Sequence, residues 1–197
     1  MTLSQAVNSL YRIAVAEGHS TSTLRLSDLA AWVVQELAAR GLAGAETEAT
    51  IPGGGRAKQW DVAWQHDGKH RLAVSLKSIL RNLAGTVPNR IDDLMGEVAN
   101  VQLYSPEIVV GYLMVLDTGQ DKSGNLWATR LAERLDRLSG RRPPSWAVGM
   151  VEASALIRVD FTHGCRLLDG SEAAARMLDV LVAEVRARNP AVGGVQA

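Results

Sequence analysis

The chain contains 197 residues, of which 47% are hydrophobic and 21% charged, and its 21 basic and 21 acidic residues leave no formal net charge. This composition is typical of one globular domain, and the neutral balance means that any nucleic-acid site must be a local patch. The lone Cys165 excludes an internal disulfide. The chain has no long uncharged apolar run and no leader pattern, which predicts a cytoplasmic protein without membrane contact.

The first half of the chain predicts two amphipathic helices followed by a three-stranded meander. Apolar residues recur at helical spacing between Leu3 and Gly18, and again from Ser27, the expected N-cap, to Gly41. The period then changes to that of β-strands, with turn signals at PGGG and HDGK. The three expected strands are ETEATIP (46–52), KQWDVAWQHDG (58–68) and KHRLAVSLKSIL (69–80).

The second half alternates helices with apolar strands. The nearly continuous apolar run EIVVGYLMVLDT (107–118) predicts a strand buried on both faces in the middle of a sheet. The other expected elements are a loop RNLAGTVPN (81–89), a helix IDDLMGEVANVQLYS (91–105), a helix at 125–138, one or two strands within WAVGMVEASALIRVDF (146–161), a helix capped by Ser171, and a frayed end GGVQA (193–197). We therefore expect an α/β or α+β fold, with a mixed central sheet between helices, in one domain spanning 1–197.

Lys77 interrupts the apolar strand AVSLKSIL, although lysine is rarely buried without a partner. If the strands on either side of HDGK pair, Asp61 lies near Ser75 and Lys77 across the hairpin. Glu97 borders the apolar stripe of the helix that follows. That helix carries a polar ridge formed by Arg90, Asp93, Glu97 and Asn100.

These residue types are suited to hydrolysis of a phosphodiester. Carboxylate oxygens hold a divalent cation such as Mg²⁺. An ammonium beside the attacking water and the scissile phosphate lowers the pKa of the water and offsets developing negative charge. The candidate catalytic residues are therefore Asp61, Lys77 and Glu97, with Asp61 and Glu97 as the metal ligands.

The motif resembles that of the PD-(D/E)xK nuclease superfamily, which includes most type II restriction endonucleases. The order of helix, three-stranded meander, helix and strand over about 27–117 is similar to the core of that family. Asp61 matches the first acidic position, although Trp60 replaces the preceding proline, and Ser75-Leu76-Lys77 matches the second motif only at its lysine. A subgroup of restriction enzymes has the same Ser-x-Lys substitution and takes the missing carboxylate from the next helix, the role that the resemblance gives to Glu97.

The resemblance implies a Mg²⁺-dependent endonuclease that cuts double-stranded DNA as a homodimer, one strand per subunit. Arginines at 141 and 142 are further candidates for phosphate contacts. The most apolar candidate surfaces for a dimer are the helices at 3–17 and 171–188. The expected DNA-binding residues are Ser75, Arg81, Asn89, Arg90 and Asn100.

Three other interpretations remain open. Asp61 and Lys77 could form a cross-strand salt bridge on a solvated face, with Glu97 a plain surface residue and Glu36 the next candidate acid. The chain could instead be an inactive nuclease-like subunit that binds DNA or assembles a DNA-processing or defence complex, which Ser75 favours. An unrelated α/β protein with a small-molecule site is the third.

Two aromatic residues and one glycine-rich loop bear on DNA contact. Trp60 and Trp64 lie four residues apart on one strand, so alternation predicts that both face away from Asp61 and serve packing rather than base stacking. The loop PGGGRAK lacks the Gly-Lys-Ser/Thr ending of a phosphate-binding loop. Its glycines predict a flexible hairpin tip that could touch DNA.

Overall fold

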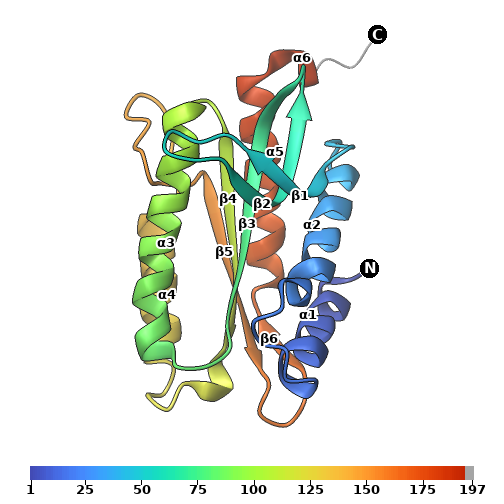
Figure 1. Cartoon of the computed structure of the whole chain (residues 1–197), viewed down its shortest axis with the longest axis vertical. Coiled ribbons are helices and arrows are strands. Elements are labelled where there is room, and N and C mark those ends of the chain that lie inside the picture. Colours follow the sequence, from blue (N-terminus) through green and yellow to red (C-terminus); the bar gives the residue numbers. More distant parts are fainter. Residues whose placement is uncertain (194–197) are drawn as a thin grey trace.

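The computed structural model describes residues 1–193, in which a central sheet is enclosed by helices (Figure 1). The end GGVQA lies outside the described residues apart from Gly193. The helices are α1 (Leu3–Tyr11), extended by the π-helical turn η1 (Arg12–Ala16), then η2 (Thr23–Leu26), α2 (Ser27–Ala39), α3 (Leu83–Tyr104), η3 (Thr118–Gln120), α4 (Leu126–Arg137), α5 (Ser171–Arg188) and α6 (Pro190–Gly193). The strands are β1 (Glu46–Ile51), β2 (Lys58–His66), β3 (Lys69–Ile79), β4 (Val109–Asp117), β5 (Ala153–Asp160) and β6 (Arg166–Asp169).

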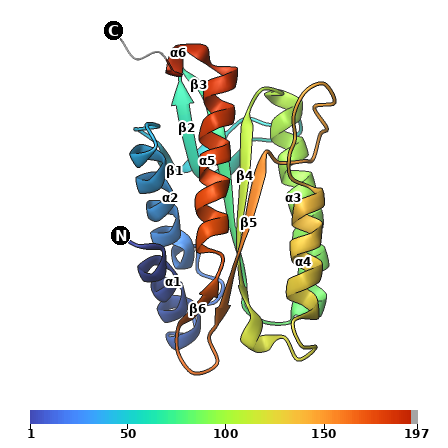
Figure 2. The same ribbon diagram turned by 180° about the vertical axis from the view of Figure 1, so that it is seen from behind.

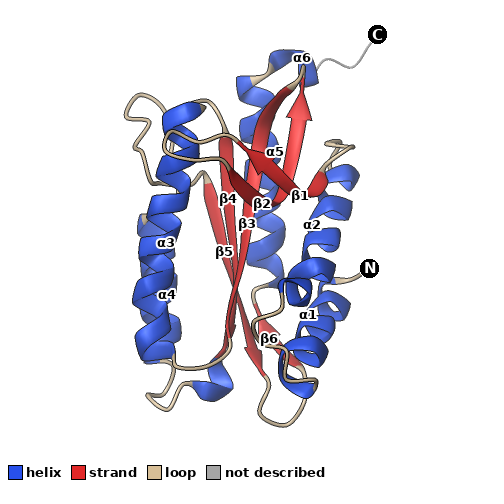
Figure 3. Ribbon diagram, in the orientation of Figure 1, coloured by secondary structure: helices blue, strands red, loops and turns tan. Residues whose placement is uncertain are grey.

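The strands form one six-stranded sheet in the order β1-β2-β3-β4-β5-β6. The first three are an antiparallel meander, β3, β4 and β5 run parallel, and β6 pairs antiparallel with the end of β5. Every residue of β4 is buried, which confirms the predicted central strand. The mixed sheet with helices on both faces confirms the predicted fold class (Figure 3).

The helices bury two separate apolar clusters, one on each face of the sheet. α1, α2 and α5 cover one face, while α3 and α4 cover the other (Figure 2). Along β3, Val74 and Leu76 belong to the first cluster and Ala73 and Ile79 to the second. Because side chains alternate along a strand, Ser75 and Lys77 emerge on the α3 face.

The predicted loop at 81–89 is helical from Leu83 onward, because α3 begins there and contains Pro88. A proline inside a helix cannot bond to the carbonyl four residues earlier, which is why the sequence favoured a loop. Here that carbonyl belongs to the exposed Ala84, where water can satisfy it. The longer helix places Asn89 and Arg90 on the same rigid element as Glu97.

The two predicted helix caps are also wrong, each by one residue. Ser27 is the first residue of α2, and its Oγ donates to the carbonyl of Leu24 at 2.7 Å. Gly170 precedes α5 with a φ of +98°, and Ser171 is the first helical residue. A Cβ at this glycine would lie 2.4 Å from the Leu156 carbonyl oxygen, so a side chain is excluded there.

The apolar faces of α1 and α5 complete the core of the monomer. Leu3, Val7 and Leu10 of α1 are buried, as are Leu178 and Leu181 of α5. The prediction that these helices present apolar dimer surfaces is therefore wrong, because their apolar residues cover the sheet. Among residues 1–193, no helix combines the length and the hydropathy that crossing a bilayer would need.

Candidate functional site

The β2–β3 hairpin brings Asp61 and Ser75 together. The register pairs Val62 with Val74, so Asp61 lies opposite Ser75. Asp61 Oδ2 accepts a hydrogen bond from the Leu76 backbone N–H at 2.7 Å and lies 3.5 Å from Ser75 Oγ. This backbone donor fixes the orientation of the carboxylate on the sheet.

Helix α3 adds Glu97 to the same group. Glu97 Oε2 lies 3.2 Å from Ser75 Oγ and 3.5 Å from Lys77 Nζ, and that Nζ lies 3.9 Å from Asp61 Oδ2. The side chains of Asp61, Lys77 and Glu97 are 25%, 19% and 15% exposed, so water and small ions can reach them. The structure thus brings together the four residues on which the sequence argument depends. We call Asp61, Ser75, Lys77 and Glu97 the carboxylate–lysine centre.

The other candidate acid lies elsewhere. Glu36 Oε2 pairs with Arg40 Nη1 on α2 at 2.5 Å. Because α2 packs in the cluster on the opposite face of the sheet, this carboxylate belongs to a different layer from the carboxylate–lysine centre.

A second lysine, which the sequence argument missed, also contacts Glu97. Lys58 Nζ pairs with Glu97 Oε1, so the carboxylate lies between two ammonium groups. Lys58 precedes Asp61 by three residues, and regular alternation would place the two side chains on opposite faces. The alternation is interrupted instead. The register leaves Glu48 opposite Asp61, and Glu48 has a φ of +59°.

The same interruption separates the two tryptophans. Trp60 packs in the cluster beneath α3, and Trp64 packs in the cluster beneath α1, α2 and α5. The prediction that both lie on the face opposite Asp61 is therefore wrong, because two consecutive residues, Trp60 and Asp61, turn toward α3. Both indole rings are buried, at 2% and 6% exposure, which confirms that they serve packing.

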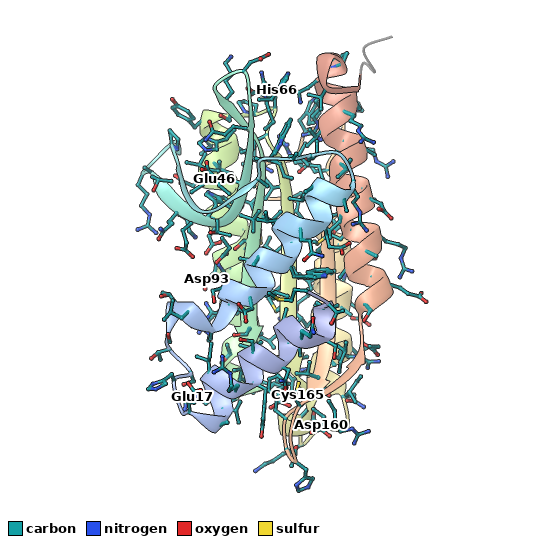
Figure 4. All side chains as sticks on the ribbon, turned by 90° about the vertical axis from the view of Figure 1, so that its right-hand side faces the viewer. Glu17, Glu46, His66, Asp93, Asp160 and Cys165 are labelled. Atoms are coloured by element: carbon teal, nitrogen blue, oxygen red, sulfur yellow. The ribbon has the colours of Figure 1, made fainter. Side chains whose placement is uncertain are left out.

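A cleft of about 510 Å³ lies between the β1–β2 hairpin loop and α3. It is lined by Gly55, Arg56, Lys58, Asp92, Asp93, Gly96, Glu97 and Asn100. Asn100 fastens the loop: its Oδ1 accepts from the N–H groups of Gly55 (2.9 Å) and Arg56 (3.3 Å), and its Nδ2 donates to the Arg56 carbonyl at 2.9 Å. Asn100, expected to contact DNA, therefore has its amide engaged in positioning the loop. Figure 4 shows Asp93 on the same side of the molecule as this hairpin.

The remaining predicted DNA-binding residues lie along the start of α3. Arg81 and Asn89 are exposed. Arg90 is partly buried, and its Nη1 donates to Asp93 Oδ2 at 2.9 Å, whereas its buried Nε has no hydrogen-bond partner within the described residues. Arg81 precedes α3, whereas Asn89 and Arg90 lie in its first half.

Arg141 is not available for the predicted phosphate contact. Its side chain is 1% exposed and its Nη1 donates to Glu152 Oε1 at 3.0 Å. The prediction for this residue is wrong because Arg141 is buried and forms an ion pair with Glu152, eleven positions later in the chain. Arg142 is exposed.

Tyr112, on β4, contacts the backbone of Arg90. Its OH donates to the Arg90 carbonyl at 3.5 Å, and the ring is fully buried on β4. Burial raises the pKa of the Tyr112 phenol, and the negative charge of Glu97 raises it further. The phenol therefore remains protonated at neutral pH and is not a general base for the neighbouring centre.

The donor set of the centre fits a hard divalent cation. Oxygen atoms of Asp61 and Glu97 lie within 3.5 Å of the same Ser75 hydroxyl, so small side-chain movements bring two carboxylates to one ion. Mg²⁺ commonly takes one or two carboxylates and completes its shell with water and phosphate oxygens. No cluster of three or more His, Cys, Asp or Glu side chains suited to a metal occurs between residues 1 and 193. Any cation here would therefore depend on two protein carboxylates.

Scans against protein-family models, curated proteins and solved structures found no match to this chain. The function of this chain is therefore inferred from the geometry of the carboxylate–lysine centre.

Proposed function

We propose that this protein is a Mg²⁺-dependent DNA endonuclease that hydrolyses phosphodiester bonds, acting as a sequence-specific type II restriction enzyme. The observation that carries the proposal is the grouping of Asp61, Glu97 and Lys77 around the Ser75 hydroxyl. Two carboxylates and one ammonium at a solvent-accessible point of a mixed sheet are the groups that this hydrolysis requires. The resemblance to the Ser-x-Lys subgroup of PD-(D/E)xK nucleases supports the same function.

The charged residues of the centre, together with Lys58, have distinct roles in this proposal. Asp61, oriented by the Leu76 N–H, and Glu97 would hold the cation between them. Bound Mg²⁺ supplies Lewis acidity toward the phosphate and lowers the pKa of a coordinated water. Lys77 orients the attacking water and offsets the charge that develops on the phosphate oxygens. Lys58 balances the second oxygen of Glu97 until substrate arrives.

The proposed substrate is double-stranded DNA, and the proposed assembly is a homodimer. The β1–β2 hairpin contributes Arg56 and Lys58 to the cleft, while Arg81 precedes α3 and Arg90 lies within it. In this proposal these four cations make the phosphate contacts, although Asp92, Asp93 and Glu97 line the same cleft and Mg²⁺ would have to offset their charge. A two-fold dimer would supply one centre for each DNA strand.

A second candidate function is an inactive nuclease-like subunit that binds DNA or assembles a DNA-processing or defence complex. Ser75 stands where the motif has a carboxylate, so the second acidic ligand at the centre would have to come from Glu97 on α3 rather than from β3. Such a subunit would keep DNA binding and lack cleavage.

Cleavage of supercoiled plasmid with Mg²⁺ and with EDTA tests the first function against the second. The wild-type protein should cut only with Mg²⁺, and Glu97→Gln should lower the single-turnover rate by about 10²-fold or more, because the cation loses one of two carboxylates. Ser75→Ala should reduce the rate much less, since a neutral hydroxyl is not an anionic ligand.

The matched control is Glu36→Gln, the same substitution on α2, which should cleave at the wild-type rate. Cleavage by Glu97→Gln at the wild-type rate would show that another acid holds the cation. A wild-type protein that binds DNA but never cuts would favour the inactive subunit.

A further inference from the structure

Arg25, in the turn η2, reaches the strand that carries the catalytic lysine. Its Nε donates to Ser78 Oγ at 3.3 Å and its Nη1 donates to the Ser22 carbonyl at 2.6 Å. Ser78 directly follows Lys77 in β3. An arginine has five N–H groups, and these contacts use two of them. Within the described residues, the other three have no protein acceptor.

Arg90 approaches from the opposite side. It lies on α3, whereas Arg25 lies in the segment joining α1 to α2, and in Figure 1 these two segments flank β3. Burial lowers the pKa of the Arg25 guanidinium, the positive charge of Arg90 lowers it further, and the negative charge of Asp61 raises it. Arg25 therefore experiences the charges of both Arg90 and the first proposed metal ligand.

Two guanidinium groups whose charges act on each other repel, and an anion between them removes this cost. Asp93 engages only Nη1 of Arg90, and within residues 1–193 the buried Nε of Arg90 has no acceptor. A buried donor without a partner costs free energy and calls for a ligand that satisfies it. Arginine forks match the geometry of phosphate oxygens, so a phosphate is the anion best suited to this position.

A purely structural role for Arg25 accounts for less of the geometry. The contacts with Ser22 and Ser78 fasten η2 to β3, and a neutral donor could make both of them. They do not explain why the charge of a second arginine, Arg90, acts on Arg25 from α3, or why the buried Nε of Arg90 has no acceptor among the described residues. An anionic ligand explains the cationic pair and the free donors together.

We propose that Arg25 and Arg90 form a binding site for a backbone phosphate of the DNA strand, next to the phosphate that the carboxylate–lysine centre would cleave. This site rests on the proposed nuclease function, and it adds Arg25, from the N-terminal layer, to the DNA-binding surface. The ligand is a phosphodiester group, held by charge and by the arginine forks, so the contact is independent of base sequence.

The test is the salt dependence of DNA binding without metal, measured by fluorescence anisotropy of a labelled duplex in EDTA. Arg25→Ala should weaken binding several-fold and reduce the slope of log Kd against log salt by about one phosphate contact. Arg90→Ala should have a similar effect. Arg25→Lys should retain the slope but recover only part of the affinity, since an ammonium cannot form the bidentate contact.

Two further variants separate phosphate binding from folding. Ser78→Ala removes the hydrogen bond that anchors Arg25 and keeps the guanidinium, so its salt slope should remain that of the wild type. Arg12→Ala removes an exposed arginine of the neighbouring turn that pairs with Glu17, and it should bind DNA as the wild type does.

The outcomes distinguish this site from the nuclease proposal. A wild-type protein that cuts DNA, with an Arg25→Ala variant of unchanged affinity and slope, would overturn the phosphate site alone. A slope lowered equally by Ser78→Ala and Arg25→Ala would assign Arg25 a structural role and overturn it as well. A wild-type protein that binds no DNA at low salt would overturn the nuclease proposal together with this site.

Discussion

Two clusters of charged side chains in this molecule differ in how completely their charges are satisfied. One joins Arg141, Glu152 and Arg188, and we call it the buried cluster. Glu152 is 0% exposed in its side chain and accepts from Arg141 Nη1 (3.0 Å), Arg188 Nη2 (2.9 Å) and the Val110 N–H (2.6 Å). The Trp146 ring covers both guanidinium groups, at 5.1 and 4.6 Å from its centroid.

The carboxylate–lysine centre has the opposite character. Its lysine contacts are long, at 3.5 and 3.9 Å, and its side chains keep 15–25% of their exposure. The side chains of Arg141, Glu152 and Arg188 in the buried cluster are 1%, 0% and 10% exposed, and their contacts hold the loop before β5 and the end of α5 to the sheet. The carboxylate–lysine centre keeps solvent-accessible oxygen and nitrogen atoms, which a cation and a phosphate would contact. Burial and contact length therefore distinguish the structural ion cluster from the candidate functional one.

Breaking the buried cluster should produce the largest effect on stability. Glu152→Gln leaves the buried guanidinium of Arg141 without a counter-charge, whereas Arg188 keeps its pair with Glu184, and the free energy of unfolding should fall by about 3–5 kcal/mol. Chemical denaturation followed by circular dichroism measures this. Glu133→Gln, which removes the exposed partner of Arg137, is the matched control and should change stability little. A Glu152→Gln variant as stable as the control would contradict the comparison.

A substitution in the carboxylate–lysine centre should affect cleavage strongly and stability little. Lys77→Met keeps the length of the side chain and removes its charge, so single-turnover cleavage with Mg²⁺ should fall by about 10²-fold. The free energy of unfolding should change by less than about 1 kcal/mol, because the pairs that Lys77 makes are long and partly solvated. Measuring both quantities on one sample sharpens the contrast. A large loss of stability with intact cleavage would make Lys77 a structural residue.

The smallest effect concerns Asp117, a buried carboxylate at the end of β4. Burial raises its pKa, although N–H groups of Phe161 and Gly119 oppose the shift, and the charge of Asp160 raises it further. A raised folded-state pKa means that stability falls as pH rises from the ordinary aspartate value through the raised one. Asp117→Asn should remove this decline and gain less than about 1 kcal/mol at neutral pH. Denaturation across acidic and neutral pH checks this, and a parallel decline in both proteins would contradict it.

Much of the fold follows from local patterns in the sequence. The period-two strands around HDGK predicted the hairpin that pairs Asp61 with Ser75, and the apolar run of β4 predicted the buried centre of the sheet. The assignment of Glu97 to the site followed from its position beside the apolar stripe of α3. These features depend on short-range periodicity, which one sequence displays directly.

Other features depend on contacts that no local pattern displays. Lys58 joins Glu97 only because alternation is interrupted at Asp61. Arg141 is enclosed by a glutamate and an arginine from two later elements. Arg25 reaches Ser78 from a short turn without periodicity. In each case the deciding partner is distant in sequence, or the backbone departs from its regular repeat.

Direct cation binding tests the central claim, that Asp61 and Glu97 form one metal site. Mn²⁺ titration followed by electron paramagnetic resonance should show binding to the wild type, and the double variant Asp61→Asn with Glu97→Gln should lose at least tenfold in affinity. The control removes another carboxylate pair, Asp117→Asn with Asp160→Asn, near the end of the molecule marked by Asp160 in Figure 4. It should bind as the wild type does. Equal Mn²⁺ affinity in the wild type and in the Asp61/Glu97 variant would contradict the account.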